Sequence, residues 1–90
     1  MAITTKYKQQ LKARAHKLKP IVFIGTNGLT DNVKKEINRG LNDHELIKIR
    51  IHETDREIRH ALFHEACEAV EATPVQLIGS IGIIYRKNES

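Results

Sequence analysis

The segment KPIVFIGTNGLT, residues 19–30, decides the fold of this chain. Residues 21–24 form a short, wholly apolar run rich in β-branched side chains, which predicts a central strand covered on both faces and puts Phe23 in the core. The sequence Gly25-Thr26-Asn27-Gly28, here called the glycine loop, then breaks the strand. Thr30 is a suitable N-cap for the helix that follows. The segment therefore predicts a strand, a loop and a helix start in immediate succession.

Helices are predicted on both sides of this segment. Before it, apolar residues at steps of three and four predict a helix from Thr4 or Thr5 to Leu18, which Pro20 ends. The apolar stripe of this helix comprises Ile3, Tyr7, Leu11, Ala15 and Leu18. After the loop, the spacing of Val33, Ile37 and Leu41 predicts a helix over residues 31–41, closed by residues 40–43.

The second half of the chain continues the alternation of strands and helices. Residues 45–52 alternate, with Ile47, Ile49 and Ile51 on one face, which predicts a strand with one buried side. Thr54-Asp55-Arg56-Glu57 reads as a capping box in which Thr54 caps a third helix that runs to about residue 72. Residues 75–78 and 83–85 are predicted strands, and the glycine-containing residues 79–82 join them as a hairpin.

The predicted order of elements is α-β-α-β-α-β-β. Two strand–helix–strand units imply parallel, right-handed crossovers, and the terminal hairpin adds an antiparallel strand. We therefore expect an α/β fold in a single domain over residues 1–90, with a mixed four-stranded sheet packed by helices. The pattern leaves open whether the first helix covers a face of the sheet or one of its edges.

The composition bears on where in the cell the protein acts. No stretch approaches the roughly 20 apolar residues that a membrane helix needs, and residues 1–19 lack the apolar core of a secretory signal. A single cysteine, Cys67, allows no internal disulfide, which favours a reducing, cytoplasmic environment. On its helix Cys67 reads as a small apolar filler, and the nearby Glu65 and Glu68 would raise the pKa of its thiol.

Charge is distributed unevenly along the chain. Residues 1–50 hold 11 Lys and Arg against 4 Asp and Glu, a net of +7, whereas residues 51–90 hold 4 against 7, a net of −3, and the two sum to +4. A basic half of this kind favours a polyanionic partner, although a solvated basic face without a partner has the same composition.

The glycine loop is the centre of the predicted site. Glycines between a strand and a helix start allow another backbone to approach closely, and the helix start offers free N–H groups to phosphate. The loop lacks the patterns of nucleotide-binding loops. Basic residues precede and follow it. The predicted RNA-binding set is Gly25, Thr26, Asn27, Gly28, Lys12, Lys17, Lys19, Lys34, Lys35 and Arg39.

Other kinds of site find little support. Aromatic residues are few and Phe23 is assigned to the core, so recognition of the backbone and shape of structured RNA is favoured over base stacking. His60 and His64 share a helix face but lack the HExxH pattern, and no serine stands in a Gly-x-Ser-x-Gly context. We expect no metal, no cofactor and no catalysis.

The same residues resemble a known family. Residues 19–30 are similar to the opening of the CRM domain (chloroplast RNA splicing and ribosome maturation), residues 45–49 resemble its second strand, and residues 75–86 resemble its closing hairpin. The length resembles the bacterial stand-alone members of the YhbY type. The resemblance implies a fold like the C-terminal domain of translation initiation factor three with an added N-terminal helix. It also implies RNA binding through the GxxG loop and its basic surround. Many relatives carry a lysine inside the loop, where this chain has Thr26 and Asn27.

These observations lead to one functional hypothesis and one alternative. The first is a monomeric RNA-binding protein with no DNA or membrane partner. The resemblance to the bacterial stand-alone members implies that the RNA is ribosomal and that the protein assists assembly of the large ribosomal subunit. The alternative is a protein-interaction module that docks on a ribosomal or assembly protein through its acidic third helix. The glutamates that motivate the alternative are Glu57, Glu65, Glu68 and Glu71.

Overall fold

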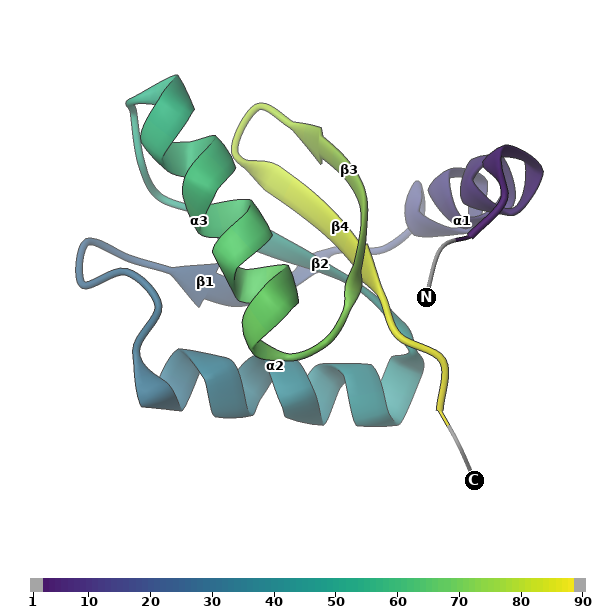
Figure 1. The fold of residues 1–90 in the computed structure, drawn as a ribbon, viewed down its shortest axis with the longest axis horizontal. Coiled ribbons are helices and arrows are strands. Elements are labelled where there is room, and N and C mark those ends of the chain that lie inside the picture. Colours follow the sequence, from purple (N-terminus) through teal and green to yellow (C-terminus); the bar gives the residue numbers. More distant parts are fainter. Residues whose placement is uncertain (1–2, 89–90) are drawn as a thin grey trace.

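The computed structural model describes residues 3–88 and has the predicted order of elements (Figure 1). The helices are α1 (Thr5–Ala15), α2 (Asp31–His44) and α3 (Arg56–Ala69), and the strands are β1 (Pro20–Ile24), β2 (Leu46–Ile51), β3 (Thr73–Ile78) and β4 (Ile81–Tyr85). Predictions for residues 1–2 and 89–90 lie outside this range.

The strands form one mixed sheet in the spatial order β1-β2-β4-β3. The β1–β2 pair is parallel, whereas β4 pairs antiparallel with both β2 and β3. This confirms the predicted α/β fold with a mixed four-stranded sheet. The position of β1 corrects the prediction of a central strand, because β1 lies at one edge and pairs only with β2.

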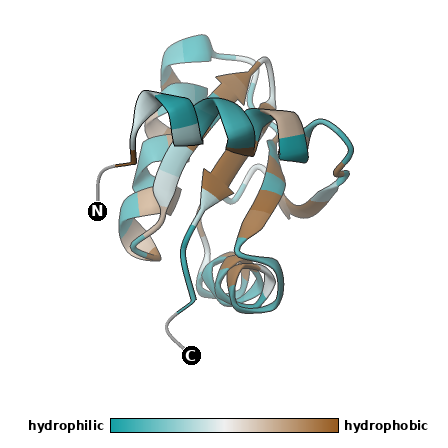
Figure 2. Ribbon diagram, turned by 90° about the vertical axis from the view of Figure 1, so that its right-hand side faces the viewer, coloured by the Kyte–Doolittle hydropathy of each residue, from teal (hydrophilic) through white to brown (hydrophobic). Residues whose placement is uncertain are grey.

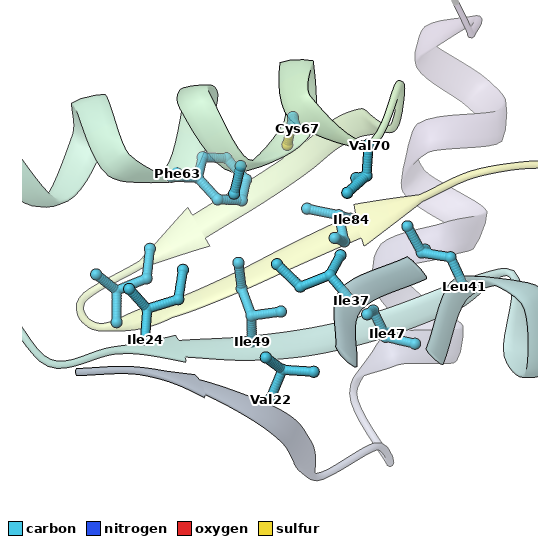
Figure 3. Packing of buried hydrophobic residues seen from close by; sticks show 12 residues of the cluster. Val22, Ile24, Ile37, Leu41, Ile47, Ile49, Phe63, Cys67, Val70 and Ile84 are labelled. Atoms are coloured by element: carbon cyan, nitrogen blue, oxygen red, sulfur yellow. The ribbon is translucent and has the colours of Figure 1, made fainter. Parts of the chain in front are cut away.

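One face of the sheet is closed by α2 and α3. From the strands, Val22, Ile24, Ile47, Ile49 and Ile84 point toward the helices (Figure 3). From α2, α3 and the C-cap of α3, the same buried cluster includes Ile37, Leu41, Phe63, Cys67 and Val70. The alternation predicted for β2 is thereby confirmed, since Ile47, Ile49 and Ile51 are all buried.

The other face is covered by α1 alone (Figure 2). Leu11 and Ala15 of α1 pack on Leu46, Ile83 and Val75 of three neighbouring strands. The hydroxyl groups of Tyr7 and Tyr85 share a hydrogen bond of 3.1 Å. The question that the sequence left open is thereby answered: α1 covers a face of the sheet, and only part of it.

Phe23 and Ile21 are not core residues. Phe23 is 60% exposed and Ile21 is 49% exposed, whereas the alternate residues Val22 and Ile24 are buried. Phe23 is exposed because α1 packs on β2, β4 and β3 and leaves β1 uncovered on that side. The apolar run of residues 21–24 predicts a strand with two covered faces, but only one face of β1 has a covering layer.

Three local predictions also change. Thr54 does not cap α3: the Asp55 carboxylate accepts from the N–H groups of Glu57 and Ile58, while the Glu53 carboxylate accepts from the Asp55 N–H. The stronger acceptor one position later takes the cap. Gly40 does not close α2 but lies inside it, where the lack of a side chain lets Ile21 and Ile47 pack close to the helix.

The end of α1 is the third change. The helix ends at Ala15, and Leu18, which was assigned to its apolar stripe, is 38% exposed in the segment that leads to β1. Thr4 caps the helix by accepting from the Tyr7 N–H, which agrees with the predicted start.

Arg86 joins β4 to both helices of the closed face. Its guanidinium donates to the Asn38 and Asn42 side-chain oxygens at 2.7 and 2.9 Å, and to the Val70 carbonyl at 2.8 Å. Arg86 therefore has a structural task at the end of the sheet away from the glycine loop.

Candidate nucleic-acid interface

The glycine loop is a tight turn between β1 and α2. The Gly28 N–H donates to the Gly25 carbonyl at 3.0 Å, and the Thr30 N–H donates to the Gly28 carbonyl at 3.1 Å. Gly28 has a φ of +71°, a conformation that residues with a Cβ rarely adopt. Thr26 and Asn27 form the tip of the turn and are exposed. The turn therefore favours glycine at position 28, and it presents the side chains of Thr26 and Asn27 to solvent.

The start of α2 places basic groups next to this turn. Thr30 is the N-cap, as predicted, and its hydroxyl accepts from the Val33 N–H at 3.2 Å. Lys34 and Lys35 follow one turn into the helix, half-buried and exposed respectively. Arg39 lies further along, beside a hollow of about 260 Å³ that Glu36 and Asp43 also line. Of the predicted cations on α2, Lys34 and Lys35 are therefore nearest the loop, and Arg39 lies among carboxylates.

The basic residues before β1 lie at the opposite end of that strand. Lys12 is on α1, and Lys17 and Lys19 are in the segment that leads to Pro20. The five residues of β1 separate Pro20 from Ile24 by about 13 Å, and the loop follows Ile24. Figure 1 shows α1 and the loop at opposite sides of the molecule. The structure thus divides the predicted set into a loop end and an α1 end.

The loop end also contains neighbours that the sequence did not suggest. Leu62 of α3 lies against Gly28, at 3.9 Å from the place a Cβ would occupy. The His52 N–H donates to the Ile24 carbonyl at 2.8 Å, and the Arg59 guanidinium donates to the Glu53 carbonyl at 3.0 Å. Through Leu62, α3 therefore reaches the loop. Only the parallel pairing of β1 with β2 creates this proximity, so no local sequence pattern could have revealed it.

The other candidate groups are the two histidines of α3 and Cys67. The rings of His60 and His64 lie 4.6 Å apart, but within residues 3–88 no three His, Cys, Asp or Glu residues are grouped so as to hold a metal ion. Burial and the nearby Glu68 carboxylate raise the pKa of the Cys67 thiol to about 12. This confirms Cys67 as a filler of the core. Among the described residues, no helix is long and apolar enough to cross a membrane.

The CRS1 / YhbY (CRM) domain family matches residues 3–86 of this chain. The chain belongs to the CRM domain family. A Pseudomonas aeruginosa relative carrying the name "Probable RNA-binding protein" is 44% identical over 88 residues, which are 98% of this chain and 85% of the relative. A Haemophilus influenzae relative named "RNA-binding protein" is 44% identical over 87 residues, which are 97% of this chain and 88% of the relative.

A solved structure agrees with this assignment. The solution structure of a Staphylococcus aureus protein superimposes on this CRM domain with a TM-score of 0.86 at 34% sequence identity. The match covers 99% of this chain and 93% of the other. The three helices and the mixed sheet are thus shared, and the resemblance stated from the sequence is confirmed.

Proposed function

We propose that this CRM domain binds structured RNA at the loop end, where the glycine loop meets the start of α2. The observation that carries the proposal is the conjunction of an exposed turn, free N–H groups at a helix start and the adjoining Lys34 and Lys35. Phosphate oxygens accept from such N–H groups and attract such ammonium groups. The names of two relatives, which call them RNA-binding proteins, support the same class of partner.

The finer proposal concerns the RNA and the role. We propose that the RNA is ribosomal and that the protein assists assembly of the large ribosomal subunit in the cytoplasm. It would act there as a monomeric domain spanning residues 1–90, by binding and without catalysis. The support is the family resemblance together with the charge asymmetry of +7 against −3 between residues 1–50 and 51–90.

The test is RNA affinity measured across a salt series with fragments of large-subunit precursor RNA. The double variant Lys34→Ala/Lys35→Ala should bind every fragment more weakly, and the slope of log affinity against log salt should fall by roughly two. The matched control is Lys6→Ala/Lys87→Ala, which removes two exposed cations outside the loop end and should change the slope much less. Equal slopes in all three proteins would contradict the proposed loop-end contacts.

A fragment series separates the finer proposal from general RNA binding. Preference for large-subunit over small-subunit precursor fragments of equal length supports a role in large-subunit assembly. Equal affinity for both would leave RNA binding in place and contradict the assigned target.

The protein-interaction alternative keeps one supporting observation. Glu57, Glu65, Glu68 and Glu71 are all exposed along or just after α3. If ribosomal proteins remain bound in pull-downs after complete nuclease digestion, and are released by Glu65→Lys/Glu68→Lys, then α3 is the principal docking surface and RNA is not the primary partner.

A further inference from the structure

The half of the sheet that α1 leaves uncovered carries a row of four cross-strand neighbours. Phe23 pairs with Arg50, Arg50 pairs with Ile81, and Ile81 pairs with Ile78, so that one row crosses all four strands. Cross-strand partners point to the same face of a sheet, and this face is the one on which α1 packs further along. Phe23 and Ile78 are 60% and 59% exposed, and Arg50 is exposed too. We call this row, together with Lys48, the open face.

The open face adjoins the glycine loop. Phe23 lies two residues before Gly25 on β1, at the end of the strand where the loop begins. A nucleic-acid backbone held at the loop would therefore have its bases within reach of the Phe23 ring.

Basic groups line the open face in the other direction as well. Lys48 lies two residues before Arg50, on the same side of β2. Next to Lys48, a hollow of about 340 Å³ lies between the end of α1 and the starts of β1 and β2. Leu18, Ile21 and Leu46 give this hollow an apolar wall, and Arg14, Lys19 and Lys48 surround it with positive charge. Among the residues that the structure describes, none that lines this hollow is acidic. The open face thus connects the loop end with the α1 end of the predicted basic set.

An exposed aromatic ring beside an arginine, on a positively charged sheet, matches the chemistry of an unpaired nucleotide. A base stacks on an aromatic face, and the guanidinium and ammonium groups attract the flanking phosphates. A protein partner would find the same apolar row, but the lysine and arginine side chains beside it complement a polyanion better.

We propose that an unpaired nucleotide, next to the helical RNA held at the glycine loop, stacks its base on Phe23 while its flanking strand follows Arg50 and Lys48 across the open face. This inference rests on the proposed function. It changes the expected mode of recognition, because the assignment of Phe23 to the core had disfavoured base stacking.

The test compares two RNA hairpins that differ only in one bulged nucleotide, which is 2-aminopurine. Wild type should bind the bulged hairpin more tightly and quench its fluorescence, because stacking on an aromatic ring quenches this base. Phe23→Leu, which keeps an apolar side chain without a ring, should lose about tenfold in affinity for the bulged hairpin, together with the quenching. Its affinity for the fully paired hairpin should stay within about twofold of wild type.

Phe23→Trp is the matched control, since it keeps an aromatic face and should retain both the affinity and the quenching. Thermal unfolding of each variant checks the fold, which should stay intact because the Phe23 side chain is 60% exposed.

The outcomes separate this inference from the proposed function. If wild type binds both hairpins equally and with a steep salt dependence, base stacking on Phe23 is wrong and RNA binding at the loop stands. If wild type binds neither, both proposals fall. Sedimentation that shows a dimer which Phe23→Leu converts to a monomer would assign the open face to a second copy of the chain and overturn the inference.

Discussion

The two faces of the sheet are built from similar side chains but are covered to different extents. On the closed face, the strand side chains share one buried cluster with residues of α2 and α3, and Ile24, Ile49 and Ile84 are fully buried. On the other face, α1 buries Leu46 and Ile83 but leaves Phe23 and Ile78 to solvent. The closed face therefore carries most of the stability, and the open face is free to bind.

The largest effect is expected from a cavity in the closed face. Ile49→Ala removes a fully buried side chain at the centre of the cluster and should lower the free energy of unfolding by about 3–4 kcal/mol. Phe23→Ala should lower it by less than about 1 kcal/mol, because the ring already contacts water. Urea denaturation measures both. Comparable losses would show that the open face is as closely packed as the other.

Overpacking the same layer should have the next largest effect. A Cβ at Gly82 would lie 2.7 Å from two ring atoms of Phe63 and 3.2 Å from Ile49, and Phe63 is itself buried. Gly82→Ala should therefore cost about 1–3 kcal/mol of stability. Gly25→Ala is the control, because a Cβ there meets nothing within 4 Å. An unchanged melting temperature for Gly82→Ala would mean that the ring can shift without cost.

The covered part of the α1 face should respond more weakly. Tyr7→Phe removes the hydrogen bond to Tyr85 and should cost about 1 kcal/mol. The bond to Tyr7 and burial raise the pKa of Tyr85 to about 12. In Tyr7→Phe, Tyr85 is the only tyrosine left, so absorbance at alkaline pH reports its ionisation alone. Its pKa should fall toward 10, and a value that stays near 12 would assign the shift to burial.

The smallest effect on stability is expected from changes of pH that stay below 9. The pKa of Cys67 is raised from 9.0 to about 12 in the folded protein, so the folded state holds the thiol proton more tightly than the unfolded chain. The corresponding stability is fully present below pH 9 and is lost as the pH rises toward 12. The melting temperature should thus show no pH dependence arising from Cys67 up to pH 9, and it should fall above pH 9. The melting temperature of Cys67→Ala should fall less steeply above pH 9 than that of wild type. If the two proteins lose melting temperature equally at alkaline pH, the raised pKa of Cys67 is wrong.

Local sequence patterns predicted most of the secondary structure. The spacing of Ile47, Ile49 and Ile51 predicted β2 and its buried side, and Thr30 predicted the start of α2, because both features depend on residues close together in the chain. The capping of α3 was misassigned by one residue, since Thr54 and Asp55 are both suitable acceptors and only the observed hydrogen bonds distinguish them.

The candidate site was predictable in part. The glycine loop and the adjoining Lys34 and Lys35 are neighbours in sequence, so a pattern could find them. The separation of Lys17 and Lys19 from the loop, and the approach of α3 to Gly28, depend on strand length and on which strands pair. A local sequence motif specifies neither the length of a strand nor its pairing partner.

The sequence by itself determined the order of helices and strands, the turn at residues 25–28, the basic first half and the family. These features follow from periodicity, capping and composition, which act over a few residues. Only the tertiary structure decided that β1 lies at an edge and that α1 stops short of it, leaving Phe23 exposed beside Arg50. An apolar side chain favours burial wherever a covering layer exists, and the position of that layer is a property of the whole chain.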